Sequence, residues 1–542
     1  MKRIFASLLI LACLSSVTFG AIPAGAVWEM RTTGAQASGG GFCWTSLVNA
    51  TYKWTASASG TNEYYCEIAA GGDPSLVGSG SVTCDGNYNL STAGAVGSLA
   101  AGQHAFGDND KLGYTTPYVR LANGLDPDAM IARGQPGYVS YGAGGTDYSQ
   151  QADAQMSATD IRITRGDNKQ VYRTGATKWA QDYDNNSLHI TAGAGFTPGW
   201  YHIQSVDPNN DALLDTSPGA AGTNGGTGAV GGAFLIGGAA DDDYMEAWVP
   251  GNRAYIRSGA YTLGEAMYTS ENSTVTAHFI VSGYSSSRGE LPIGTSRPIL
   301  ACGSNSFGWG GSYFYCENIE ATGTGAKVFT CSGSRSVVFN CRATNTAAGG
   351  VDAFLIAGTG VTLIACEGQT ASAGTGAAFN MSVAVCDACY AHDSPRGFYV
   401  DDDFSAVLNS IADTCVTGIY DDSVDGMNPN LYAGNTIYNC TNGIYFSGAR
   451  VGLVVNNAIS ECTNGINRNG AGTVDGNLHS LYNVMNNTTD FTDAVSHISN
   501  IFGDPGLNAP ATGDFSIDSS DTNVYEQGVD VGYFTTAITY DE

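Results

Sequence analysis

The sequence predicts an all-β protein whose C-terminal half winds as a solenoid of parallel strands. Three observations predict it: a phrase that recurs every 20 to 25 residues, abundant glycine, and a hydrophobic fraction of 43% beside only 13% charged residues. Glycine supplies 73 of 542 residues without a Gly-X-Y period, which excludes collagen and favours tight turns between short strands. The composition also excludes a disordered chain.

The repeat is clearest in a cysteine phrase. Cys-x-x-Gly-Ile begins at Cys440 and Cys462, and the related Cys-Val-Thr-Gly-Ile begins at Cys415, at intervals of 25 and 22 residues. Equivalent residues of successive coils stack about 4.8 Å apart as parallel strands. We therefore expect one inward column made of the following residues: Phe354, Phe379, Phe398, Ile419, Ile444 and Ile466.

An Asn-x-Ile phrase precedes each of these cysteines, at Asn409, Asn435 and Asn457, and predicts an asparagine column. Helical repeats are excluded because a 3.6-residue periodicity is missing, and leucine-rich repeats because their dense leucine pattern is missing.

Cysteines form two columns. Because stacked side chains point in parallel rather than toward each other, we expect these residues to be buried and mostly unpaired. The first column contains Cys341, Cys366 and Cys389 and continues to Ser410, and the second contains Cys415, Cys440 and Cys462.

These features resemble right-handed parallel β-helix proteins of the pectate-lyase-like class. Residues 255–263 look like the first coil of such a domain, and residues 501–507 followed by 513–517 are similar to its closing segment. The resemblance implies a right-handed parallel β-helix over residues 245–530 and a C-terminal tail over 531–542. It is specific for the fold and weak for the activity.

Small antiparallel β modules are expected before the β-helix. Residues 22–42 and 142–160 resemble two pieces of the N-terminal segment of some bacterial and phage β-helix proteins, where the pieces lie close together. Residues 43–141 are then an inserted small β-sandwich module. A Cys66–Cys84 disulfide within it stays open.

Residues 142–235 are expected to form an N-terminal β or cap module. Strand-like stretches and a turn at residues 207–211 predict antiparallel pairing there. The run Gly219–Gly238 is rich in glycine and poor in charge, which predicts a flexible linker before the β-helix.

The N-terminus has the order of a secretory signal over residues 1–21. Lys2 and Arg3 precede an apolar run and then small residues, with cleavage expected near Gly20 or Ala21. A lipobox ending at Cys13 is the alternative, and it would leave a lipid anchor. No later stretch reaches 18 apolar residues, so no membrane-spanning segment is expected. We expect a secreted or cell-surface protein.

The charge excludes one class of partner. With 22 Lys and Arg against 50 Asp and Glu, the formal net charge is -28. A polyphosphate would be repelled by this surface, so nucleic acid is not expected to bind.

The candidate site lies on two adjacent coils. Counting four residues from the glycine of each coil stacks Asp401 on Asp422, with Asp402 and Arg396 nearby. Carboxylate oxygens are ligands for Ca²⁺, so Asp401, Asp402 and Asp422 are the candidate metal ligands. In polysaccharide lyases of this fold, Ca²⁺ acidifies the proton beside the uronate carboxylate and an arginine or lysine removes it, which implies catalytic roles for Arg396, Asp401 and Asp422.

Two other interpretations of this cluster stay open. Two carboxylates at a suitable separation act as acid and base in glycoside hydrolysis. Aspartate is also simply favoured in loops between strands.

Two classes of function follow. We expect a structural and recognition protein that binds a polysaccharide, a cell-surface or matrix component, or a second copy of itself. The Arg-x-Lys, paired-Asp and Gly-His-Gly signatures of polygalacturonases are missing, and cations are few after residue 300. The alternative is a Ca²⁺-dependent polysaccharide lyase or related carbohydrase. The two differ in whether Arg396, Asp401 and Asp422 converge in one exposed groove or disperse around the coil.

Overall fold

The computed structural model describes most of the chain from residue 26 to residue 517. The predicted signal segment, with Cys13, and the predicted tail 531–542 lie outside the described residues. These residues are 26–42, 54–66, 81–84, 88–90, 94–107, 109–110, 116–121, 139–142, 147–237, 241–274, 278–286, 288, 290, 296–325, 327–371, 373–423, 429–447, 452–469, 478–492 and 496–517.

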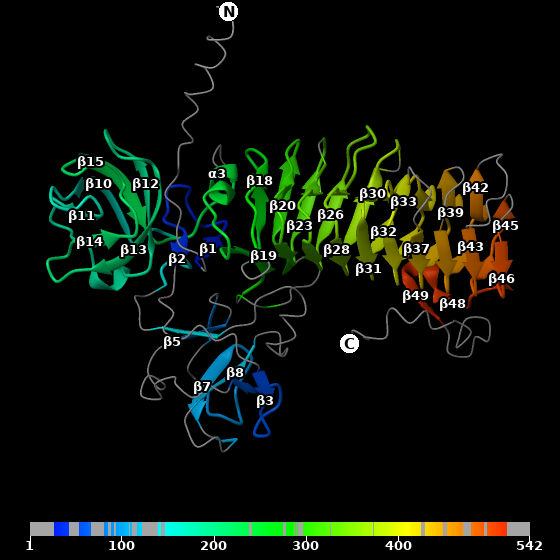
Figure 1. The fold of residues 1–542 in the computed structure, drawn as a ribbon, viewed down its shortest axis with the longest axis horizontal. Helices are drawn as coiled ribbons and strands as arrows, with labels where there is room; N and C mark the ends of the chain where they lie inside the picture. The colour runs from blue at the N-terminus through cyan, green and yellow to red at the C-terminus, as the bar shows by residue number, and fades with distance from the viewer. Residues whose placement is uncertain are drawn as a thin grey trace, which may run out of the picture.

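The chain forms a parallel β-helix, as predicted, in which each coil adds one strand to each of three long sheets (Figure 1). Within the described residues sheet 1 has 13 strands: β2 (Gly41–Phe42), β1 (Val27–Met30), β16 (Arg253–Arg257), β19 (Phe279–Tyr284), β22 (Phe314–Glu317), β25 (Val337–Phe339), β28 (Val361–Ile364), β31 (Ala384–Asp387), β34 (Ala406–Leu408), β37 (Asn430–Ala433), β40 (Gly452–Val455), β43 (Leu478–Leu481) and β46 (Ser496–Ile498).

Sheets 2 and 3 run beside it along the same axis. In the same part of the chain sheet 2 has 11 strands: β17 (Ala260–Thr262), β20 (Ile299–Gly303), β23 (Glu320–Gly323), β26 (Arg342–Asn345), β29 (Glu367–Thr370), β32 (Tyr390–His392), β35 (Ile411–Asp413), β38 (Thr436–Tyr438), β41 (Ala458–Ser460), β44 (Val484–Asn486) and β47 (Ile501–Phe502). Sheet 3 has 10: β18 (Met267–Thr269), β21 (Phe307–Trp309), β24 (Phe329–Cys331), β27 (Phe354–Ile356), β30 (Ala377–Met381), β33 (Arg396–Val400), β36 (Thr417–Asp421), β39 (Asn442–Ser447), β42 (Asn464–Asn469) and β45 (Thr489–Thr492).

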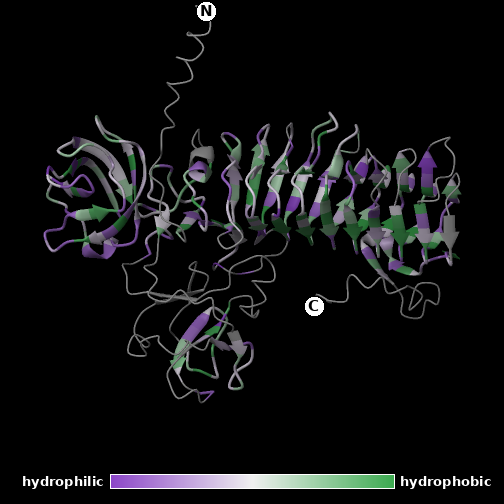
Figure 2. Ribbon diagram, viewed as in Figure 1, coloured by the Kyte–Doolittle hydropathy of each residue, from purple (hydrophilic) through white to green (hydrophobic). Residues whose placement is uncertain are grey.

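The predicted inward column is confirmed in sheet 3. Strand pairing places Phe354, Phe379 and Phe398 side by side and continues through the three isoleucines to Ile466. The rings of Phe354 and Phe379 stack with centroids 5.0 Å apart and nearly parallel planes. All six side chains are buried in one continuous core, and Figure 2 shows hydrophobic residues repeating along the coils.

The expected asparagine column exists, but its register differs by one residue from the prediction. Strand pairing sets Ile411 beside Thr436, so Ser410 rather than Asn409 stacks on Asn435. Asn409 lies one position earlier, in the left-handed region at φ 47°. Short polar residues tolerate this conformation at a corner. The asparagine ladder therefore consists of Asn435, Asn457, Asn483 and Asn500.

The cysteine prediction is confirmed for the described part of the chain. Both predicted columns point into the core and are buried and unpaired, together with four further cysteines: Cys302, Cys316, Cys331 and Cys386. Cys316 and Cys341 approach to 4.0 Å between sulfurs. Burial raises the pKa of Cys366, so this thiol stays protonated and unreactive.

The first β strand belongs to the β-helix itself. β1 pairs in parallel with β16, and Arg288 connects the N-terminal pieces through Glu29, at 2.6 Å, and Asp147, at 3.4 Å. Helix α3 (Asp241–Glu246) contacts β18, with Tyr244 and Met245 buried in the core. The start of the solenoid is therefore covered rather than open.

A closed antiparallel barrel precedes α3, and it lies at one end of the β-helix in Figure 1. Its strands, in barrel order, are β10 (Met156–Ile163), β11 (Gln170–Arg173), β14 (Ala212–Leu214), β13 (Gly199–Val206), β12 (Ser187–Ala192) and β15 (Asn224–Val230).

The prediction of a flexible linker over Gly219–Gly238 is wrong, because β15 closes the barrel by pairing with β10 and β12. Glycine is needed there for space: a Cβ on Gly226 would lie 2.7 Å from the Phe196 ring, and one on Gly228 would lie 2.6 Å from the His189 carbonyl oxygen.

Two small antiparallel sheets come from residues 54–142. One contains β3 (Trp54–Ala56), β4 (Tyr64–Cys66), β8 (Thr116–Arg120) and β7 (Gln103–Gly107), and the other β6 (Tyr88–Leu90), β5 (Ser81–Cys84) and β9 (Val139–Gly142). The side chains of Cys66 and Cys84 lie outside what the structure describes, so their pairing stays open.

The last described residues form a hairpin of β48 (Leu507–Ala509) and β49 (Asp514–Ile517). The Phe515 ring centroid lies 6.2 Å from that of Tyr390 and 6.1 Å from that of Tyr438. The hairpin therefore lies against the outer face of sheet 2.

Candidate functional site

Three tyrosines form a ladder on the outer face of sheet 3. Tyr399, Tyr420 and Tyr445 are direct strand neighbours on β33, β36 and β39. Each follows a buried residue of the inward column, so alternation along the strand turns the tyrosine outward. The ring centroids are 5.5 Å and 5.0 Å apart, and the rings are tilted to each other. We call this set the tyrosine ladder.

Arg396 contacts two rings of the tyrosine ladder. Its guanidinium carbon lies 4.4 Å from the Tyr399 ring centroid and 4.3 Å from the Tyr420 centroid. At these distances a cation is attracted by the ring quadrupoles. The only positive charge predicted for the site is thus held against the aromatic rings.

The Tyr399 hydroxyl joins the two predicted carboxylates. It lies 3.1 Å from Asp401 Oδ1 and 3.0 Å from Asp422 Oδ2. Strand pairing sets Val400 beside Asp421, so the two carboxylates follow in register. Partial burial and the charges of both carboxylates raise the pKa of Tyr399 well above its usual value, so the hydroxyl remains a proton donor at neutral pH.

The three residues predicted as catalytic therefore converge through Tyr399 instead of dispersing around the coil. Asp402 does not join them, because its carboxylate accepts hydrogen bonds from Ser382 and from the backbone of Asp403. Within the described residues no group of three or more His, Cys, Asp or Glu side chains could hold a metal ion. The assignment of Ca²⁺ to Asp401, Asp402 and Asp422 stays a prediction.

Amide side chains continue the site beyond Tyr445. Asn469 Nδ2 donates to the Tyr445 hydroxyl at 2.6 Å, and Asn442 Oδ1 accepts from Asn464 and Asn467. Tyr445 and these asparagines were not among the predicted site residues. The signal that identifies Tyr445 and Asn467 is the second position after the repeated glycine, which is outward in each of these coils.

A second polar cluster lies on the outer face of sheet 2. Glu367 contacts Arg342 at 3.2 Å and His392 Nε2 at 3.2 Å, and His392 Nδ1 lies 2.9 Å from Asp393. The hydrogen bond from His392 lowers the pKa of Glu367. Burial opposes the charged form of His392, but its hydrogen bonds to Glu367 and Asp393 raise its pKa overall.

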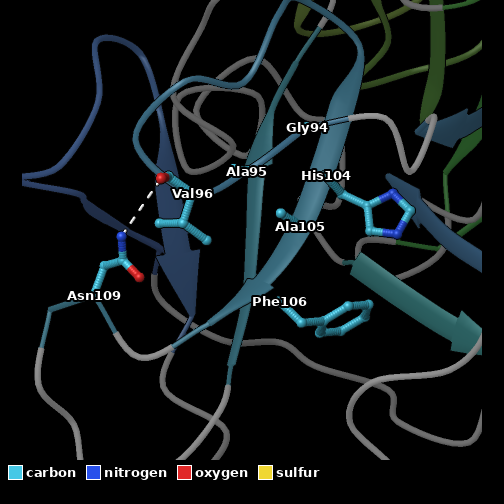
Figure 3. A pocket seen from close by; sticks show the side chains of 7 residues that line it. All are labelled: Gly94, Ala95, Val96, His104, Ala105, Phe106 and Asn109. Atoms are coloured by element: carbon cyan, nitrogen blue, oxygen red, sulfur yellow. Dashed lines mark hydrogen bonds between the residues drawn. The ribbon is translucent and has the colours of Figure 1, made fainter.

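An open pocket of about 560 Å³ lies in the small module before the barrel. His104 and Phe106 project from β7 on the same side, and Asn109 donates to the Val96 carbonyl at 3.4 Å (Figure 3). This pocket contains none of the predicted site residues. The helices that the structure describes are all too short or too polar to cross a membrane.

The three sheets define the chain as a parallel β-helix protein. No protein-family model matches the sequence, and no curated protein matches it. Among solved structures, the fold is similar to the pectate lyase Pel9A, with 15% identity and a TM-score of 0.39, over 53% of this chain and 82% of that one.

Two further solved structures are similar. One is a PL6 family polysaccharide lyase from Pseudopedobacter saltans, with 12% identity and a TM-score of 0.33, over 52% of this chain and 96% of that one. The other is a GH87 α-1,3-glucanase from Streptomyces thermodiastaticus, with 11% identity and a TM-score of 0.28, over 61% of this chain and 74% of that one. At these identities the likeness concerns the fold alone.

Proposed function

We propose that this protein is a secreted or cell-surface recognition protein that binds a polysaccharide along the tyrosine ladder. The observation that carries the proposal is the outward stack of Tyr399, Tyr420 and Tyr445 on a rigid sheet. Sugar rings present apolar C–H faces that pack on aromatic rings, while their hydroxyls hydrogen-bond to polar side chains nearby. The flanking aspartates and asparagines supply such partners.

The protonation of Tyr399 and the stacking of Arg396 favour binding over catalysis. The Tyr399 hydroxyl stays protonated and lies between two carboxylates, so it serves as a hydrogen-bond donor rather than a general base. The Arg396 cation lies on the tyrosine rings. These groups form a preorganised surface.

The test uses soluble neutral and acidic polysaccharides, each with and without Ca²⁺, in affinity electrophoresis and titration calorimetry. Tyr420→Ala, at the centre of the ladder, is expected to weaken binding about tenfold. Tyr268→Ala is the matched control, because Tyr268 occupies the same outward column but is separated from the ladder by four residues: Gly308, Thr330, Leu355 and Asn380. Equal losses in both variants would contradict the proposal.

The alternative function is tested in the same samples. The convergence of Arg396, Asp401 and Asp422 is what favours a Ca²⁺-dependent polysaccharide lyase or related carbohydrase. Unsaturated products are followed by ultraviolet absorbance and new reducing ends by a colour assay. If the unaltered protein forms products and Arg396→Ala abolishes their formation, the enzyme interpretation replaces the binding proposal.

A further inference from the structure

We infer that the tyrosine ladder takes a neutral, extended polysaccharide lying parallel to the axis of the β-helix, and that it rejects polyuronates. The inference rests on the proposed binding function and names the ligand class of that site. It follows from three features of the described residues: the engagement of the local cation, the charge around the ladder, and the direction in which the rings repeat.

The cation at the ladder is already engaged. The Arg396 guanidinium lies over both Tyr399 and Tyr420, at 4.4 Å and 4.3 Å from their ring centroids. A uronate carboxylate would have to compete with two rings for this group. Recognition of a carboxylate by arginine usually uses the free fork of guanidinium N–H groups, and stacking restricts the directions from which that fork can be approached.

Negative charge borders the ladder on two sides. Asp401 and Asp422 meet at the Tyr399 hydroxyl, beyond the carboxyl ends of their strands. Asp352 lies near the preceding coil, where it accepts from Asn380 Nδ2 at 2.9 Å. A polyuronate carries one negative charge for each sugar, so it would place like charges against these carboxylates, whereas a neutral glycan can donate its hydroxyls to them.

Three other arginines of the described coils have partners of their own or are buried. Arg335 donates to the Tyr313 hydroxyl at 2.5 Å, Arg342 contacts Glu367 on the outer face of sheet 2, and Arg468 is buried, at 4% exposed. Each is therefore held by its own surroundings. These three arginines therefore add little charge complementarity for a polyanion beside the ladder.

The direction of the bound polysaccharide follows from the stacking of the tyrosine rings. Tyr399, Tyr420 and Tyr445 come from successive coils, so the line through their rings runs along the solenoid axis. Ring centroids 5.5 Å and 5.0 Å apart match the rise of one sugar unit in an extended chain. One pyranose against the outer edge of each tyrosine ring gives a site for three consecutive sugars, and the amides of Asn467 and Asn469 continue the polar edge.

The experiment compares polymers that differ in charge. Hydroxyethyl cellulose, galactomannan and a soluble β-1,3-glucan are the neutral probes, and alginate and polygalacturonate are the acidic ones. Each is measured at about 0.05 M and about 0.5 M salt, with Ca²⁺ and with chelator. Neutral di-, tri- and tetrasaccharides then give the length of the site.

The inference predicts binding of at least one neutral polymer with little change between the two salt concentrations, and an affinity that rises up to the trisaccharide. Tyr420→Ala should weaken it about tenfold, while Tyr420→Phe keeps the ring and most of the affinity. Tyr445→Ala provides a second ladder variant, and Tyr268→Ala should bind as the unaltered protein does.

Two other outcomes overturn the inference in distinguishable ways. If a polyuronate binds, with or without Ca²⁺, and Tyr420→Ala weakens that binding, the neutral class is wrong while the proposed binding function stands. If none of these polymers binds, or if binding is unchanged in both Tyr420→Ala and Tyr445→Ala, the proposed function fails as well.

Discussion

The corner between sheets 1 and 2 is built differently in two halves of the same β-helix. In the earlier coils the corner position holds Cys341, Cys366 and Cys389, and in the later coils it holds the asparagine ladder. Ser410 is the junction, accepting from the Cys389 amide at 3.0 Å and donating its own amide to Asn435 at 2.9 Å. The backbone path continues through the junction unchanged.

The difference between the halves is one of bonding. Asn457 Oδ1 accepts from both the amide and the side chain of Asn435, each at 2.9 Å, and its Nδ2 donates to the Tyr432 carbonyl at 2.9 Å. The Cys366 sulfur makes weak contacts with carbonyl oxygens, at 3.4 Å and 3.5 Å. The asparagine corner thus connects neighbouring coils by directional bonds, whereas the cysteine corner fills apolar space.

Removing one member of the asparagine ladder should have the largest effect. Asn457→Ala removes the acceptor of the buried Asn435 backbone amide and one of the two acceptors of its side-chain amide, and we expect a loss of about 3 kcal/mol in unfolding free energy. Denaturant titration followed by circular dichroism measures it. Asn508→Ala, in the exposed hairpin, is the matched control and should change stability by less than about 0.5 kcal/mol. A loss for Asn457→Ala as small as that of the control would show that the asparagine ladder does not stabilise the contact between neighbouring coils.

The inward columns were predictable because their side chains face only other coils. Phe354, Phe379 and Phe398 stack on like residues, so the spacing of these residues in the sequence gives the length of each coil. The register of the asparagine column was not predictable, because Asn409 and Asn435 begin the same Asn-x-Ile phrase. Only strand pairing shows that the ladder position directly precedes the strand and that the Ser410 hydroxyl occupies it in one coil.

The candidate site was predicted in part. Counting from the repeated glycine placed Asp401 and Asp422 in register, because β33 and β36 end at the same position of their coils. The role of Tyr399 between them was not predicted, since an outward and an inward tyrosine look alike in sequence. Strand β15 was not predicted either. Its Gly226 is required by close packing against Phe196, but a glycine-rich sequence is also typical of a flexible segment.

Changing the cysteine corner should have a smaller effect. Cys366→Ala removes one buried sulfur and leaves a small cavity, and we expect a loss of about 1 kcal/mol. Thiol titration of the unaltered protein supports the comparison: the ten described cysteines should be unreactive when folded and should all react in denaturant without reductant. Fewer than four reactive thiols in denaturant would contradict an unpaired cysteine core.

The smallest expected effect is a pH-dependent contribution of His392 to stability in the half of the β-helix with the cysteine corner. On the cysteine half, His392 faces Glu367, Asp393 and Asp413 from the outer surface of sheet 2, and Tyr390 stacks on its ring. Because the pKa of His392 is raised in the folded protein, its contribution is fully present below the unfolded value of about 6.5 and is lost as the pH rises through the folded value.

His392→Gln should therefore reduce stability by less than about 1 kcal/mol near pH 5.5, and by less still near pH 9, where the imidazole is neutral in both states. The pH of about 5.5 is chosen to keep Glu367 ionised, since the pKa of this carboxyl is lowered. His479→Gln, an exposed position beside the asparagine ladder, is the control for replacing a histidine and should change stability by less than about 0.5 kcal/mol. A larger loss for His392→Gln at pH 9 than at pH 5.5 would show that its ring packing, rather than its charge, stabilises these coils.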